Sequence, residues 1–172
     1  MQNEQQSVGK WTSCDSRNSL TAQLTPAAYG LLVTDSPNSW GYITFDYDII
    51  IPIGFADMGL LPIAIKHENK IFVGIDEVLA GYDEINSSCI FKYKMPTVFH
   101  EFVRFDQDEL IVRDEVGFIG ISYTGDEHWN YCVGLIATYT IDQKKIVGET
   151  EEGEQFEFSV PDEAFSIPTV PN

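Results

Sequence analysis

The sequence predicts an all-β fold, built from antiparallel sheets that follow one another along the chain. The main observation is a repeat: KIFVGIDEVLAGYDEINSSCIFKYKM is followed by ELIVRDEVGFIGISYTGDEHWNYCV, in the same order of apolar strand, acidic turn, apolar strand, loop and aromatic strand. Corresponding residues lie about 38 to 39 positions apart, a period typical of sheets repeated side by side. Short runs of β-branched and aromatic residues alternate with turn residues, and no segment has the pattern of a long amphipathic helix.

The chain of 172 residues is expected to form one domain, because its hydrophobic content of 44% is enough to fill a core. Residues 1–28 are rich in Gln, Ser, Thr and Asn, and we expect a partly ordered leader there. Residues 29–61 are expected to form an N-terminal β segment. In this segment a turn at Pro37 and Asn38 is expected to join strands over 29–35 and 40–53 as a hairpin.

Residues 62–160 are expected to carry the repeat, in units of up to four strands. The predicted strands cover 63–67, 70–76, 78–84 and 89–95 in the first unit, 100–105, 109–114, 117–123 and 128–133 in the second, and 136–142, 144–150 and 155–160 in the third. The third unit lacks a fourth strand, since the following PDEAFSIPTVPN contains three prolines and cannot supply a full set of ladder donors. Residues 161–172 are expected to form a tail.

Three short stretches recur within the units. They are Phe72-Val73-Gly74 with Asp76, Leu79-Ala80-Gly81-Tyr82-Asp83, and Ile90-Phe91-Lys92-Tyr93, with counterparts at 111–112, 117–121 and 128–131. In these stretches the units resemble blades of the quinoprotein-type β-propeller family. A closed propeller needs four or more blades, so the resemblance implies an incomplete propeller-like array of two to three four-stranded units. No quinone cofactor is expected, because the family's site forms at the centre of a complete ring.

Charge and cysteine content exclude several classes of function. The chain has 27 Asp and Glu against 10 Lys and Arg, a formal net charge of −17 that repels phosphate backbones and anionic membranes. We therefore expect neither nucleic acid nor a membrane as a direct partner. Cys14, Cys89 and Cys132 form neither a disulfide framework nor a CxxC site, which fits a reducing cytoplasm. The sequence shows no apolar signal-peptide core and no run of 18 apolar residues.

No standard enzyme signature is present: there is no GxSxG, HExxH, GxxxxGK[ST] or helix-opening GxGxxG. His100 beside Glu101, and His128, are the candidate acid–base groups. Adjacent residues of a strand point to opposite faces, so His100 and Glu101 are not expected to meet. Cys132 lies too far along its strand from His128 to be activated by it. We expect a protein that is not an enzyme, with no catalytic, cofactor or metal site.

Acidic residues dominate the turns and the C-terminal part of the chain. Because turns at one end of each unit lie on the same side of an array, these carboxylates can merge into one negative surface that binds a cationic partner. The candidate partner-binding residues are Glu149, Glu151, Glu152, Glu154, Glu157, Asp114, Glu115, Asp126 and Glu127.

The small, acidic and motif-free chain resembles in general character the immunity proteins of bacterial toxin–immunity systems, including contact-dependent growth inhibition. This resemblance implies a cytoplasmic inhibitor that masks the active site of a cognate basic toxin, such as a nuclease. It is expected to be a monomer when free and to form a 1:1 complex with the toxin. Two other hypotheses remain open: a propeller-like scaffold or adaptor that assembles through its sheet edges, and a hydrolase that uses His100 or His128.

Overall fold

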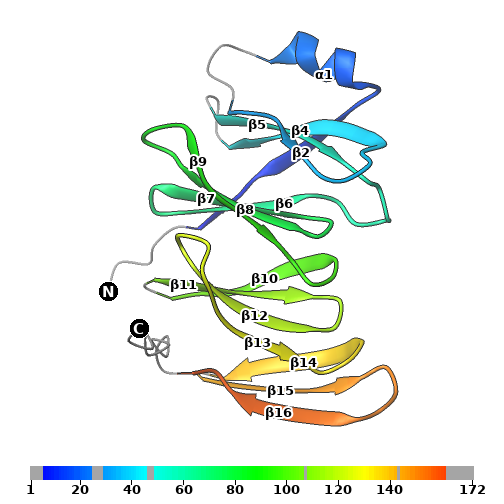
Figure 1. Ribbon diagram of the computed structural model, residues 1–172, viewed down its shortest axis with the longest axis vertical. Coiled ribbons are helices and arrows are strands. Elements are labelled where there is room, and N and C mark those ends of the chain that lie inside the picture. Colours follow the sequence, from blue (N-terminus) through cyan, green and yellow to red (C-terminus); the bar gives the residue numbers. More distant parts are fainter. Residues whose placement is uncertain (1–5, 25–28, 46–48, 107, 143, 162–172) are drawn as a thin grey trace, which may run out of the picture.

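The computed structural model describes residues 6–24, 29–45, 49–106, 108–142 and 144–161. In this part of the chain the regular structure is almost entirely β, as the sequence predicts, and the strands form four sheets stacked in one row (Figure 1). The first sheet contains β2 (Lys10–Cys14), β4 (Ser39–Phe45), β5 (Ile49–Phe55) and β3 (Leu32–Val33), in that order. The second contains β1 (Ser7–Val8), β6 (Ile63–His67), β7 (Lys70–Ile75), β8 (Val78–Asp83) and β9 (Ser88–Lys94).

The third and fourth sheets complete the row. The third contains β10 (Phe99–Phe105), β11 (Glu109–Asp114), β12 (Gly117–Ser122) and β13 (Glu127–Cys132). The fourth contains only β14 (Ile136–Asp142), β15 (Lys145–Thr150) and β16 (Gln155–Ser159). Each strand predicted between 62 and 160 begins and ends within a residue of the observed one. The segment predicted to replace a fourth strand of the last unit, and the tail, lie outside the described residues from 162 onward. Alternating patterns bounded by turns are local signals, so the strands could be located without knowledge of the tertiary structure.

The N-terminal segment is more ordered than expected. Residues of the predicted leader form β1, β2 and the helix α1 (Arg17–Gln23), while residues 1–5 and 25–28 lie outside the described part of the chain. Ser16 caps α1 by accepting a hydrogen bond from the Ser19 N–H at 3.1 Å, and Leu20 is buried. β1 pairs with β6 and β2 pairs with β4, so one short stretch of chain links the first and second sheets. Apolar anchors such as Leu20 explain this order despite the polar sequence around them.

The hairpin predicted at Pro37 and Asn38 is wrong. β3 does not pair with β4; it lies at the far side of β5 and pairs with it in parallel. The hairpin of this segment is instead formed by β4 and β5, within the stretch predicted as one strand. The turn residues before β4 pass across the end of β5 and join β3 to β4 on its other side, as the hydrogen bonds from the N–H groups of Thr34 and Asn38 to the carbonyls of Gly54 and Phe55 show.

Three apolar layers fill the spaces between consecutive sheets. Phe55 and Tyr82 meet between the first and second sheets, Phe72 packs between the second and third, and Phe118 lies opposite Phe158 between the third and fourth. Each fully buried large side chain of this kind contributes about 1.5–3 kcal/mol to the free energy of unfolding. The layers hold the sheets in a fixed order and thereby fix which turns lie side by side.

A glycine lies opposite an aromatic ring in every sheet. The pairs in register are Gly54 with Trp40, Gly81 with Phe91, Gly120 with Trp129, and Gly148 with Phe156. In each pair the ring occupies the space that a Cβ would need. The aromatic side chains that recur through the predicted units therefore have a packing role, because their rings cover the backbone of the neighbouring strand.

Candidate binding surfaces

The turns of the stacked sheets divide into two groups at opposite ends of the strands. The turns β7–β8, β11–β12 and β15–β16 lie on one side of the row, together with the loops that follow β3 and β5 (Figure 1). Exposed carboxylates occupy every one of these turns and loops. We call this surface the acidic end, and its members are Asp35, Asp57, Glu77, Glu115, Glu151, Glu152 and Glu154.

Few basic side chains lie at the acidic end. Lys94 lies there with its ammonium 3.7 Å from Glu77, and the Arg113 guanidinium is bound to Glu101 at 2.7 Å. At the opposite end, by contrast, Lys66, Arg104 and Lys145 form ion pairs with neighbouring carboxylates. Both ends of the row carry exposed carboxylates, but those of the acidic end come from all four sheets, and among them only Glu77 is paired with a lysine.

The turn between β15 and β16 presents three of the predicted glutamates, Glu151, Glu152 and Glu154. Thr150 anchors this turn because its N–H donates to the Glu154 carbonyl at 2.9 Å and its Oγ1 accepts from the Glu154 N–H at 3.2 Å. Gly153 takes the positive φ of 82° that closes the turn. None of the three glutamate side chains binds another side chain of the described residues. A rigid turn thus holds three free carboxylates in solvent.

The other predicted partner-binding residues are distributed differently. Glu149 accepts a hydrogen bond from Gln155, and Glu157 pairs with Lys145 at 2.8 Å, both on the outer face of the fourth sheet. Asp126 and Glu127 lie at the opposite end, since the turn from β12 to β13 follows that from β11 to β12. Only Glu115 and the three glutamates of the β15–β16 turn belong to the acidic end.

Asp114 cannot take part in a surface contact, so its assignment to the partner-binding set is wrong. Its side chain is buried, and its Oδ1 accepts a hydrogen bond from the Val116 N–H at 3.0 Å. This bond shapes the β11–β12 turn from inside. Asp35, Asp57 and Glu77 were missed by the sequence analysis, and their position in loops at the same end of their sheets is the signal that could have found them.

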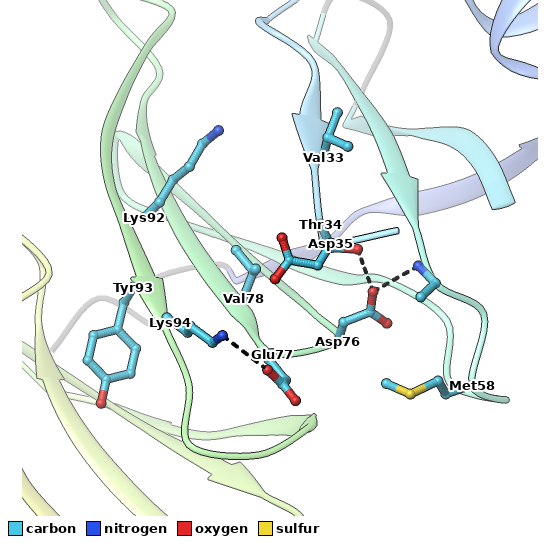
Figure 2. Close-up of a pocket in the computed structure, with 11 residues that line it drawn as sticks. Val33, Thr34, Asp35, Met58, Asp76, Glu77, Val78, Lys92, Tyr93 and Lys94 are labelled. Carbon is cyan, nitrogen blue, oxygen red and sulfur yellow. Dashed lines mark hydrogen bonds and ion pairs between the residues drawn. The ribbon is translucent and has the colours of Figure 1, made fainter. Parts of the chain in front are cut away.

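A pocket of about 500 Å³ opens between the first and second sheets, beside the acidic end (Figure 2). Its walls include Val33 and Thr34 on one side and Val78, Lys92 and Lys94 on the other. Lys92 makes no hydrogen bond or ion pair with any described residue. The pocket therefore combines an apolar wall with an uncompensated cation.

Asp76 forms the inner part of this pocket and joins the two sheets. Its Oδ2 accepts hydrogen bonds from Thr34 Oγ1 at 2.6 Å and from the Ala56 N–H at 2.9 Å (Figure 2). Asp76 is buried and has a φ of 47°, a left-handed conformation that Asp tolerates better than most residues. The carboxylate holds the β3 and β5 loops against the β7–β8 turn.

The histidines do not assemble a catalytic group with a nucleophile. No hydrogen bond joins His100 to Glu101, in line with the expectation that they do not meet directly, but a β-bulge between Phe99 and Glu101 lets both contact Arg113. Burial and the Arg113 charge lower the pKa of His100. His128 Nδ1 lies 2.7 Å from Glu109 Oε2. No hydrogen bond joins His128 to Cys132, which is an exposed free cysteine. Among the residues described, no group of three or more potential ligands is arranged to hold a metal ion.

Comparisons with known proteins assign no family. No family model and no curated protein matches the sequence. The chain is similar to the crystal structure of the computationally designed Ika4 protein with a TM-score of 0.43 and 7% identity, over 81% of this chain and 95% of that one. None of the helices described is long and apolar enough to span a membrane.

Proposed function

We propose that the chain is a cytoplasmic immunity protein, which binds a cognate basic toxin through the acidic end and so blocks the toxin's active site. The observation that carries the proposal is that exposed carboxylates from all four sheets line one end of the row, three of them unpaired on the rigid β15–β16 turn. Simple solubility does not require carboxylates held together in this way.

A nuclease toxin is the partner class that this surface fits best. Nucleases need a cationic groove to hold phosphates, and an acidic inhibitor can occupy that groove in place of the nucleic acid. Opposite potentials also accelerate the encounter of two proteins, and the acceleration decreases with salt. The net charge of −17 disfavours nucleic acid itself as the ligand.

The stacked sheets are inferred to be an incomplete propeller-like array that serves as the rigid support of this surface. Consecutive strands of the second and third sheets run in the order expected for blades, from β6 to β9 and from β10 to β13. Because the row is open, its sheets keep unpaired edges, which favours a second candidate function, a scaffold that assembles through these edges. A light-scattering mass that rises with concentration would support the scaffold and weigh against the immunity proposal.

Binding to the product of the neighbouring gene tests the proposal. The test variant carries E151Q, E152Q and E154Q, and the matched control carries E68Q, D108N and D142N, which removes the same charge from turns at the opposite end. We expect the wild-type chain and the control to capture the neighbouring basic protein and to inhibit its nuclease activity. The test variant should associate about tenfold more slowly at low salt.

Two outcomes would reject the proposal. One is the absence of any complex with the neighbouring product at low ionic strength. The other is a complex that the two triple variants weaken equally, since the acidic end would then have no special role.

A further inference from the structure

The first sheet lacks one strand that the second sheet has. β4, β5 and β3 occupy the places that β6, β7 and β8 occupy in the second sheet, and nothing described corresponds to β9. β3 is therefore the last strand of the first sheet, and its outer edge pairs with none of the residues that the structure describes. The pocket lies along this edge, in the space between β3 and β9 (Figure 2).

The backbone of β3 is ready to bind another strand. The Thr34 N–H donates to the Gly54 carbonyl at 3.0 Å, so Thr34 faces β5. Peptide groups alternate along a strand, and the N–H and carbonyl of Val33 consequently point away from β5 toward the open edge. An extended peptide that pairs with Val33 would complete the sheet by strand addition.

The side chains at this edge indicate the chemistry of the incoming strand. The wall of the second sheet offers Val78 as an apolar contact and the free ammonium of Lys92 as a cation. The carboxylates nearby have other surroundings: Asp76 Oδ2 accepts two hydrogen bonds, Glu77 faces Lys94, and Asp35 lies in the solvent-exposed loop. Lys92 is the cation of the pocket that pairs with no described carboxylate.

We propose that the open edge of β3 binds an extended segment of a partner protein, in which an apolar side chain packs on Val78 and an acidic side chain pairs with Lys92. The bound segment takes the place in the first sheet that β9 has in the second. The site adjoins the acidic end, since Asp35 and Glu77 line both, but it does not depend on the proposed immunity function.

A short capped peptide of valine and threonine with one central glutamate is the probe, and the same peptide with lysine in that place is its control. We expect the glutamate peptide to bind more tightly to the full-length chain. K92E should weaken the glutamate peptide about tenfold and strengthen the lysine peptide. K10E makes the same charge change at the opposite edge of the first sheet and should alter the affinity of neither peptide.

Amide hydrogen exchange locates the peptide independently of any variant. In the free protein the Val33 amide should exchange faster than the Thr34 amide, and bound peptide should protect Val33. V33P removes that donor and should abolish binding without lowering the thermal midpoint. If V33P does not fold, the proposal is tested by the protection of the Val33 amide in the wild-type chain and by the peptide affinities of K92E.

Three results would overturn the proposal. They are the failure of both peptides to bind, binding that leaves the Val33 amide unprotected, and a doubled mass of the chain alone with Val33 protected. The last result would mean that a second copy covers the edge.

Discussion

Replacement of Asp76 by alanine should destabilise the protein strongly, because this residue connects two sheets through one carboxylate oxygen. The variant D76A loses two hydrogen bonds to a charged acceptor, from Thr34 Oγ1 at 2.6 Å and the Ala56 N–H at 2.9 Å. Bonds of this kind contribute about 1.5–3 kcal/mol each. Alanine also tolerates the φ of 47° poorly, at a cost of about 1 kcal/mol. The expected decrease in the free energy of unfolding is about 4 kcal/mol.

Two companion variants separate the contributions. D76N keeps a carbonyl oxygen for both donors and a residue type that accepts left-handed geometry, so we expect it to cost only about 1–2 kcal/mol. D114A is the matched control, because Asp114 is buried in the equivalent turn of the third sheet but accepts only the Val116 N–H. Its expected cost is about half that of D76A.

Urea titration followed by tryptophan fluorescence measures these differences, and the chain supplies its own reporters. Trp11 and Trp40 lie in the first sheet, whereas Trp129 lies in the third. If D76A uncouples the first sheet, fluorescence from Trp11 and Trp40 should change at lower urea than that from Trp129 in single-tryptophan backgrounds. Equal costs for D76A and D114A would refute the reasoning that Asp76 bridges two sheets.

Three further predictions address other contacts. Burial lowers the pKa of His100 below 6.5, so the imidazole binds a proton more tightly in the unfolded chain than in the folded one. The free energy of unfolding should therefore fall as the pH decreases from about 7.5 to 5. Urea midpoints should show a smaller decrease in H100N. Y93F removes the hydroxyl that donates a hydrogen bond to Glu127 between the second and third sheets. Because this bond is exposed to solvent, the variant should lower the free energy of unfolding by less than about 1 kcal/mol, and a larger decrease would contradict this reasoning. G125A places a Cβ 2.5 Å from a ring carbon of Phe91 at a φ of 95°. In the control G59A, at a φ of 91°, the new Cβ meets nothing within 4 Å. Calorimetry should show that G125A lowers the free energy of unfolding by about 2 kcal/mol more than G59A.

Much of the fold follows from local sequence patterns. The strands from β6 to β16 were predicted within a residue, because alternation and turn residues are properties of neighbouring positions. β3 was assigned the wrong neighbour, since it pairs with β5 and not with β4, the strand that follows it in sequence. The N-terminal helix was missed because a single buried leucine, Leu20, anchors it within a polar sequence.

The candidate site was predictable in part. Successive turns of an antiparallel sheet alternate between its two ends, so the separation of Glu127 from Glu115 follows from strand order alone. Strand order does not predict that Asp114 is buried while Glu115 is exposed, because both residues belong to one acidic turn. Which of two adjacent carboxylates points inward depends on the hydrogen bond to Val116.

The sequence by itself determined the strands, the repeat and the surplus of negative charge, since each is written in the order and type of nearby residues. Only the tertiary structure decided that carboxylates of all four sheets line one end, that Asp76 joins two sheets, and that β3 is the last described strand of its sheet, beside Lys92. These features arise when residues distant in sequence are brought into contact by sheet stacking, and no local pattern encodes that contact.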